Sequence, residues 1–292
     1  MALAFRGRSH NILHTCNYCV VVVCCVQVPA TPEKWTEVAS EFALKWNFPA
    51  CIGALDGKHV AIKPPGNSGS MYYNYKHFHS VVLMALVDAS YRFLFVDVCS
   101  YGRVADGGVF NNCALATRLE NNSLGIPRSV ELAGVGSVPF VIVADDAFGI
   151  KSYLMKPYPL RGLTREQRIF NYRLCRARRV VENAFGILSQ RFRLFSHAIE
   201  LDPSKVETAT MAACCLYNNF LLRNNASAQC YTADISVNDE GPICSHNTFK
   251  PMQFKQGSNH SSRTASEIRG RFCAYFNSEA GSVPWQEERC ML

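Results

Sequence analysis

The spacing of apolar residues along the first hundred positions predicts one helix followed by three strands. Thr31 and Pro32 suit the N-cap and the first position of a helix, and apolar residues then recur at helical spacing as far as Asn47. Three apolar runs of strand length follow, over residues 51–62 with a glycine-loosened turn, residues 80–87 and residues 91–99. The unbroken run at 80–87 is typical of a strand that is buried on both faces.

An expected helix at residues 105–119 and a fourth strand at residues 139–144 complete this region. The fourth strand is a short apolar run that stops at Asp145 and Asp146. A meander of three strands, a helix, a fourth strand and then further helices is an α/β order with a mixed sheet flanked by helices. This order suits a ribonuclease H-like core.

The remainder of the chain has mainly helical periodicity. Thr164 and Gln167 form a capping box in front of a long apolar stripe. Two further helices are expected, one beginning at Asp202 and one over residues 263–276. Residues 226–262 lack sustained periodicity, so we expect a linker or a strap over the core there.

The basic residues are concentrated in one segment. The chain has 30 Lys and Arg against 23 Asp and Glu, and residues 151–225 alone contain 13 basic and 5 acidic residues. Such a segment indicates either a surface that meets nucleic acid or a solvated helix face. The composition, with 48% apolar and 18% charged residues, excludes a disordered chain.

The longest apolar run, residues 19–26, is far shorter than the about 20 residues that a membrane-spanning helix needs, so no membrane partner is expected. With Arg6 and Arg8 before it, the run can be interpreted as a signal peptide or as a buried β-branched segment. The 14 cysteines are irregularly spaced, which favours a reducing compartment over a disulfide framework.

Two aspartates are expected to share a metal site. In a ribonuclease H-like core the ends of the first and fourth strands lie side by side, which brings Asp56 and Asp145 together. Neighbouring carboxylates are unfavourable unless a cation neutralises them. Glu182, at the edge of the apolar stripe of the long helix, can point toward the same end of the sheet. Three carboxylates with no adjacent Cys or His ligand set favour Mg²⁺ or Mn²⁺ over zinc.

Such a centre predicts two-metal phosphoryl transfer, in which one ion activates water or a 3′-hydroxyl and the other stabilises the leaving oxygen. For Glu182 the structural alternative is a helical salt bridge with Arg178 or Arg179. Asp106, near the start of the expected helix at 105–119, is interpreted as a helix cap.

Four motifs resemble those of the PIF/Harbinger transposases and, more narrowly, of the domesticated Harbinger transposase-derived nucleases of animals. They are Gly53-Ala-Leu-Asp-Gly-Lys-His59, Tyr72-Tyr-Asn-Tyr-Lys-His-Phe-His-Ser80, Val143-Ala-Asp-Asp-Ala-Phe148 and Asn171-Tyr-Arg-Leu-Cys-Arg-Ala-Arg-Arg-Val-Val-Glu-Asn-Ala-Phe-Gly186. The resemblance covers residues 31–225, and its Arg-Val-Val-Glu-Asn-Ala-Phe-Gly block is highly specific.

The resemblance implies a metal-dependent DNA endonuclease with an Asp-Asp-Glu catalytic triad, which falls on Asp56, Asp145 and Glu182. Relatives usually have Gly before the second Asp, whereas Ala144 precedes it here and Asp146 follows, so both aspartates are candidates for the second ligand. The alternative function is a domesticated DNA-binding or adaptor protein that kept the fold and lost the reaction.

The resemblance also suggests how the chain is organised. Four segments are expected: an N-terminal remnant at 1–30, a DDE endonuclease domain at 31–225, the linker or strap at 226–262, and a C-terminal helix and tail at 263–292. The helix-turn-helix that normally precedes the catalytic domain is nearly absent, so sequence choice is expected to come from a Myb-like partner. A DNA substrate leads us to expect a nuclear and cytoplasmic protein.

DNA contacts are expected from basic side chains, chiefly those along the approach to Glu182. The candidates are Lys76, Arg161, Arg165, Arg168, Arg173, Arg176, Arg178 and Arg179. They predict binding that depends on charge and is largely independent of DNA sequence.

Overall fold

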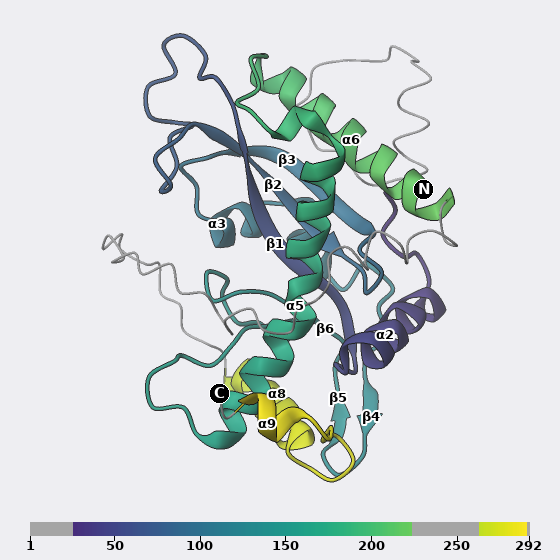
Figure 1. The fold of residues 1–292 in the computed structure, drawn as a ribbon. Coiled ribbons are helices and arrows are strands. Elements are labelled where there is room, and N and C mark those ends of the chain that lie inside the picture. The colour runs from purple at the N-terminus through teal and green to yellow at the C-terminus, as the bar shows by residue number, and fades with distance from the viewer. Residues whose placement is uncertain (1–25, 224–262, 291–292) are drawn as a thin grey trace.

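A computed structural model of the protein describes residues 26–223 and 263–290. Its centre is a mixed five-stranded sheet with the strand order β3-β2-β1-β6-β7 (Figure 1). The strands of this sheet are β1 (Cys51–Ala61), β2 (Ser80–Val87), β3 (Phe93–Tyr101), β6 (Val141–Val143) and β7 (Leu154–Met155). The first three form an antiparallel meander, whereas β6 is parallel to β1 and β7 is parallel to β6. This confirms the expected mixed sheet.

Helices flank the sheet, as a ribonuclease H-like fold requires. They are α2 (Pro32–Trp46), α3 (Asp106–Asn111), α4 (Ala114–Glu120), α5 (Arg165–Arg191), α6 (Pro203–Arg223), α8 (Arg263–Phe276) and α9 (Gln286–Cys290), with a 3₁₀ turn η1 (Arg193–Phe195). Figure 1 shows α5 lying across the sheet and α6 beside it. On β1, Asp56 meets α5 while Gly57 faces α3, and successive residues of a strand point to opposite faces. The two helices therefore cover opposite faces of the sheet.

Local sequence signals account for the ends of the principal helices. Thr31 caps α2, its hydroxyl accepting a hydrogen bond from the Lys34 amide at 3.4 Å, and the helix ends at Asn47 in the left-handed conformation with φ 55°. The capping box of Thr164 and Gln167 is present at the start of α5. Side-chain capping thus sets both helix starts.

The core lies on both faces of the sheet. All eight residues of β2 are buried, as its unbroken apolar run predicts. Helix α6 is held to β3 by Asn218, whose amide oxygen accepts from the Phe93 amide at 2.9 Å and whose amide nitrogen donates to the Phe93 carbonyl at 2.8 Å. Both backbone groups at the start of β3 are therefore satisfied by one side chain.

Arg173 ties three distant segments together below the sheet. Its guanidinium donates to the carbonyl of Asn47 at 3.2 Å, to the carbonyl of Gly281 at 3.2 Å and to the side-chain oxygen of Gln286 at 3.0 Å. The guanidinium also lies over the ring of Phe276, 4.4 Å from its centroid. We call this set of five residues the Arg173 junction, and it joins α2, α5 and the C-terminal segment.

Several sequence expectations differ from the structure. The helix expected at 105–119 is two helices, because Asn112 interrupts it and the Cys113 sulfur caps α4 by accepting from the Ala116 amide at 3.4 Å. Glycine and asparagine are poor helix formers, and α3 begins Asp-Gly-Gly and ends in Asn. Strand β1 is continuous instead of breaking at Gly57.

Some short elements have no sequence pattern that predicts them. The hairpin of β4 (Val130–Leu132) and β5 (Gly136–Val138) and the two-residue strand β7 are too short to show a period. The expected linker at 226–262 and the apolar run at 19–26 lie outside the described residues, apart from Val26, which is buried.

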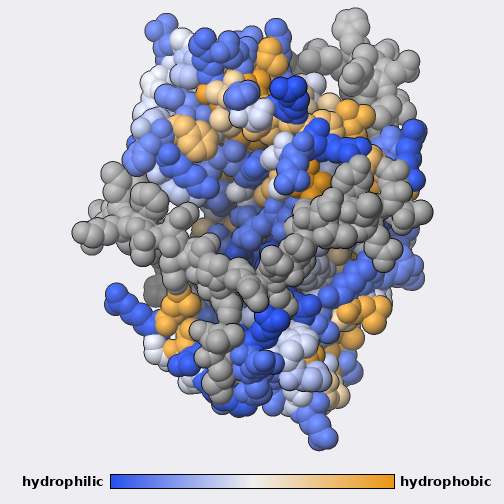
Figure 2. Space-filling model, viewed as in Figure 1, coloured by the Kyte–Doolittle hydropathy of each residue, from blue (hydrophilic) through white to orange (hydrophobic). Residues whose placement is uncertain are grey.

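The surface seen in Figure 2 is mainly hydrophilic, with hydrophobic residues gathered over its upper part near α6. Exposed apolar side chains of α6 include Leu216 and Leu222, at 53% and 49% exposure. Within the described segments, no helix combines the length and the apolar character that crossing a membrane requires.

Candidate active site

The parallel pairing of β1 with β6 brings the first two carboxylates together. Strand β6 runs parallel to β1 with Ala54 paired to Val143, and β6 stops there. Asp56 and Asp145 each follow two residues after this pair, so they lie beside each other where the sheet opens. Both side chains are half-buried. The expected adjacency of the two aspartates agrees with this register.

Helix α5 adds a glutamate and an arginine to the same place. The Arg178 guanidinium lies 2.6 Å from the carboxylate of Glu182 and 3.9 Å from that of Asp56. Arg178 and Glu182 are one helical turn apart, so the salt bridge that the sequence offered as an alternative is present. This salt bridge still leaves Glu182 near the two aspartates, because the same guanidinium also faces Asp56.

A fourth carboxylate reaches this place from the other face of the sheet. Asp106, the first residue of α3, lies against Gly57 of β1, because a Cβ added to Gly57 would be 2.2 Å from its Oδ1 atom. The expected role of Asp106 as a helix cap is wrong, because the N-cap of α3 is Ala105 and no side-chain cap is present at this start. We call Asp56, Asp106, Asp145, Glu182 and Arg178 together the carboxylate centre.

Burial and neighbouring carboxylates together raise the pKa values of these groups. Burial raises the pKa of Asp56 to about 7, with a further increase from Asp145 and a decrease from Arg178. Burial also raises the pKa of Asp106 to about 7, and the nearby Asp145 adds to the increase. The pKa of Asp145 is raised by burial and lowered by Arg178. The positive charge of Arg178 therefore does not neutralise all the negative charge of the carboxylate centre.

The donor set fits a hard divalent cation. Within residues 26–223 and 263–290, no three His, Cys, Asp or Glu side chains are grouped closely enough to hold a metal ion as they stand. The Oδ1 atom of Asp106 is nevertheless buried without a hydrogen-bond partner in the described part of the chain. Bound Mg²⁺ or Mn²⁺ would neutralise carboxylates whose pKa values are raised, and it would give the unpaired buried oxygen a partner. Asp56, Asp145 and Glu182 are the residues that would hold it.

The structure separates the two candidates for the second ligand. Asp145 is half-buried and its pKa responds to Arg178 and Glu182, and its carboxylate accepts from the Ala147 amide at 2.9 Å. Asp146 is exposed, and its backbone carbonyl accepts from Lys156 at 3.3 Å. Asp145 is therefore the aspartate that faces the carboxylate centre.

The basic side chains expected to contact DNA are in unlike environments. Arg173 is only 2% exposed and belongs to the Arg173 junction, so its guanidinium is not available to a phosphate. Arg176 is half-buried, donates to the side chain of Asn47 at 2.8 Å and lies over the ring of Trp285. Arg165 is exposed and pairs with Glu287, its Nε donating at 3.1 Å. These three arginines have partners within the protein.

The other basic side chains expected at the DNA lie closer to solvent. Arg161 and Arg168 are exposed, and Arg179 is half-buried on α5. Lys76 is exposed and lies 5.5 Å from the ring centroid of Tyr75. Lys76 also lowers the pKa of Asp106, which places its charge near the carboxylate centre. Cations are therefore present at both the helix side and the loop side of the centre.

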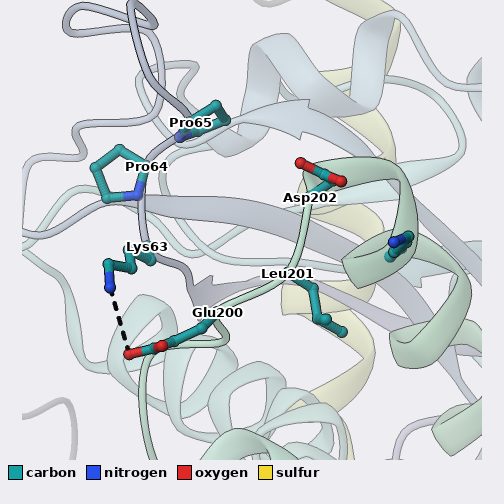
Figure 3. Close-up of a pocket in the computed structure, with 7 residues that line it drawn as sticks. Lys63, Pro64, Pro65, Glu200, Leu201 and Asp202 are labelled. Carbon is teal, nitrogen blue, oxygen red and sulfur yellow. Dashed lines mark ion pairs between the residues drawn. The ribbon is translucent and has the colours of Figure 1, made fainter.

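A separate pocket of about 280 Å³ lies where β1 leaves the sheet and α6 begins (Figure 3). It is lined by Lys63, Pro64, Pro65, Glu200, Leu201, Asp202 and Lys205. Lys63 and Glu200 form an exposed ion pair of 3.7 Å across it. None of its lining residues belongs to the carboxylate centre, so the centre does not depend on this pocket.

Part of the chain is similar to known proteins. A family profile described as DDE superfamily endonuclease matches residues 55–218. A protein of Arabidopsis thaliana named "Protein ALP1-like" is 25% identical over 193 residues, which cover 65% of this chain and 48% of that protein. Proteins of Mus musculus and Homo sapiens named "Putative nuclease HARBI1" are 26% identical over 196 residues, 66% of this chain and 52% of theirs. The chain thus spans about half the length of these curated relatives. No solved structure matches it at a significant level.

Proposed function

Because the chain belongs to the DDE superfamily endonuclease family, we propose that it is a transposase-derived endonuclease that cleaves DNA in a metal-dependent reaction at the carboxylate centre. The observation that supports this most directly is the convergence of Asp56 in β1, Asp145 just after β6 and Glu182 in α5 around a single arginine. The names of the relatives in mouse and human point to the same class of enzyme.

Each residue of the triad has a distinct role in this proposal. Asp56 offers carboxylate oxygens from strand β1, Asp145 offers them from just beyond the end of β6, and Glu182 offers them from the solvent side, where it is exposed. Bound Mg²⁺ or Mn²⁺ would activate water or a 3′-hydroxyl and stabilise the leaving oxygen of an in-line displacement. Arg178 holds the carboxylates of Asp56 and Glu182 near their working positions in the metal-free protein.

DNA binding is proposed to rest on the exposed cations around the centre. Arg161 in the loop before α5, Arg168 in the first turn of α5 and Lys76 in the loop before β2 are exposed and can meet phosphates. Such contacts are electrostatic and carry no sequence information of their own. We therefore propose that a DNA-binding partner of the Myb-like class supplies sequence choice, and that the protein is nuclear and cytoplasmic.

One observation favours the alternative, an adaptor that binds DNA without cutting it. The Arg178–Glu182 contact of 2.6 Å already gives Glu182 a counter-ion inside the protein. Calorimetric titration of the full chain with Mn²⁺ separates the two functions. Binding that is lost in Asp56→Asn supports the nuclease, whereas no binding by the wild type supports the adaptor.

The direct test of the nuclease is nicking of a supercoiled plasmid by the purified chain. Cleavage should need Mg²⁺ or Mn²⁺ and stop when the metal is chelated. The substitutions Asp56→Asn and Glu182→Gln should each abolish it while the melting temperature shows that the fold remains. Asp146→Asn is the matched control, because it removes an exposed carboxylate next to Asp145. Full cleavage activity in Asp56→Asn would show that the carboxylate centre is not the catalytic site.

The DNA-binding surface is tested by the salt dependence of duplex binding. Replacing Arg161 or Arg168 by Gln should reduce the slope of log affinity against log salt by about 0.9 for each phosphate that the variant no longer neutralises. Arg165→Gln is the comparison, because Arg165 is on the same helix and already pairs with Glu287. Equal slopes in all variants would show that Arg161 and Arg168 do not contact DNA phosphates.

A further inference from the structure

Large apolar side chains are exposed together in the segment that leads into β2. We call residues 71–79 the tyrosine loop. Its Met71, Tyr73 and Tyr75 are all exposed, and Tyr75 is the most accessible of the three, at 66% exposure. A single exposed apolar side chain needs no explanation, whereas a group of them marks a surface that meets a partner.

A buried asparagine fixes the shape of the tyrosine loop. Asn74 is only 3% exposed, and its side-chain oxygen accepts from the amides of Lys76 at 2.9 Å and Phe78 at 3.3 Å. Its side-chain nitrogen donates to the hydroxyl of Ser80 at 2.8 Å. An asparagine that bonds the backbone ahead of it in this way holds a turn in one conformation. The side chains of the next two residues, Tyr75 and Lys76, are therefore presented to solvent on a fixed turn.

The tip of this turn lies near the carboxylate centre. The ring of Tyr75 is 5.4 Å, between centroids, from the ring of His59, which follows Asp56 by three residues on β1. Burial raises the pKa of Asp106 and the charge of Lys76 lowers it, so Lys76 is also close to the centre. The Nζ atom of Lys76 lies 5.5 Å from the ring centroid of Tyr75. An exposed aromatic ring and a cation thus stand together beside the carboxylates.

A ring and a cation in this arrangement suit a nucleotide whose base has left the double helix. The base can stack on the aromatic ring while the cation meets the phosphate, and such stacking tolerates any base because every base has a flat face. In a regular duplex the bases are stacked on each other, so a base must be unpaired before a side chain can cover it. The nearby centre, proposed to act on DNA, favours this ligand over a protein.

We propose that the tyrosine loop holds unpaired bases of the DNA next to the bond that is cleaved, with Tyr75 as the stacking platform and Lys76 on the backbone phosphate. This rests on the proposed function for the choice of DNA as the ligand. It adds a substrate class, because DNA that is single-stranded or unpaired near the cut is then bound in preference to a regular duplex. Tyr75 is a binding residue in this proposal and takes no part in holding the metal.

The test is the fluorescence anisotropy of labelled oligonucleotides, single-stranded and duplex forms of one sequence, titrated with the full chain while divalent metals are chelated. Tyr75→Ala should weaken binding of the single strand about tenfold or more, as expected from the loss of one stacked base. It should leave the affinity for the duplex unchanged. Tyr75→Phe keeps the ring and should bind the single strand as the wild type does.

Two further variants separate stacking from charge and from general surface effects. Lys76→Gln should lower the slope of log affinity against log salt on the single strand by about 0.7, whereas Tyr75→Ala should leave that slope unchanged. Leu44→Ala is the matched control, because it removes an exposed apolar side chain from α2 and should not change the affinity for either form of DNA. The melting temperature of each variant shows that the fold remains.

The outcomes distinguish this inference from the proposed function. If Tyr75→Ala binds the single strand as tightly as the wild type, or loses duplex affinity equally, the loop does not hold unpaired bases and the inference alone is wrong. If the wild type binds the single strand through Tyr75 but nicks no plasmid with Mg²⁺ or Mn²⁺, the nuclease is wrong and the inference stands. If the wild type binds neither form of DNA, the loop meets another class of partner and both are wrong.

Discussion

The Arg173 junction and the carboxylate centre both place charge inside the protein, but they balance it differently. The guanidinium of Arg173 donates to neutral acceptors, with carbonyl oxygens at 3.2 Å and an amide oxygen at 3.0 Å, and it lies over an aromatic ring. The carboxylate centre has four acidic residues and one arginine, and an oxygen of Asp106 has no partner among the described residues.

This difference separates a structural charge from a functional one. A buried charge whose hydrogen bonds are all made within the protein locks segments together and gains nothing from a ligand. A cluster of like charges that is only partly neutralised lowers the stability of the metal-free protein and leaves free energy available for binding a cation. The two sites lie on the same helix, because α5 supplies both Arg173 and Arg178.

The largest expected effect is at the Arg173 junction. Arg173→Met should lower the free energy of unfolding by about 3–5 kcal/mol, because it leaves the carbonyls of Asn47 and Gly281 without a donor and removes one donor from the side-chain oxygen of Gln286. Urea unfolding measures the change, and added Mn²⁺ should not restore the missing stability. Arg168→Met, exposed on the same helix, should change it by less than about 0.5 kcal/mol. Equal effects of the two substitutions would show that the junction does not hold the segments together.

A smaller effect with a different response to metal is expected at the carboxylate centre. Arg178→Met removes the internal cation from Asp56 and Glu182 and should lower the free energy of unfolding of the metal-free protein by about 1–2 kcal/mol. A divalent cation can take over the balancing charge, so Mn²⁺ should stabilise this variant more than it stabilises the wild type. The same urea experiment with and without Mn²⁺ measures the difference. If Mn²⁺ does not raise the stability of Arg178→Met, the carboxylate centre does not differ from the Arg173 junction in its response to metal.

Sequence reasoning predicted the carboxylate centre better than the junction, for a physical reason. The order of the apolar runs suits a ribonuclease H-like core, and in that layout the first and fourth strands are neighbours, so Asp56 and Asp145 could be placed together. Helical spacing likewise placed Glu182 beside Arg178. These relations depend on backbone geometry, which the period of the apolar residues reveals.

The junction depends on contacts between segments far apart in the chain. Arg173 lies three residues after Phe170 and four before Ala177, on the buried side of α5, which is a signal that the sequence contained. Its partners Asn47, Gly281 and Gln286 come from two other segments, and no period links them. The place of Asp106 beside Asp56 was missed for the same reason, since it is explained by Gly57 in the distant strand β1.

The smallest expected effect concerns His59, a half-buried base of β1 that belongs to neither the Arg173 junction nor the carboxylate centre. Burial lowers its pKa to about 4, with a further decrease from Lys76, and its Nδ1 atom is 2.9 Å from the hydroxyl of Ser80. Because the folded pKa is below the ordinary value near 6.5, the unfolded chain binds the proton more readily. The stability that neutral His59 contributes is therefore complete above about pH 6.5 and is lost as the pH falls toward about 4.

The expected loss is about 1 kcal/mol between pH 7 and pH 5, less than the full shift implies because the ring is partly accessible to solvent. Urea unfolding of the wild type and of His59→Gln at both pH values measures it as a difference, which removes the contribution of the carboxylates from the comparison. The stability gap between the two proteins should narrow on acidification. A gap that is the same at pH 5 and pH 7 would mean that His59 is protonated as easily in the folded protein as in the unfolded chain, and that burial and Lys76 do not hold it neutral.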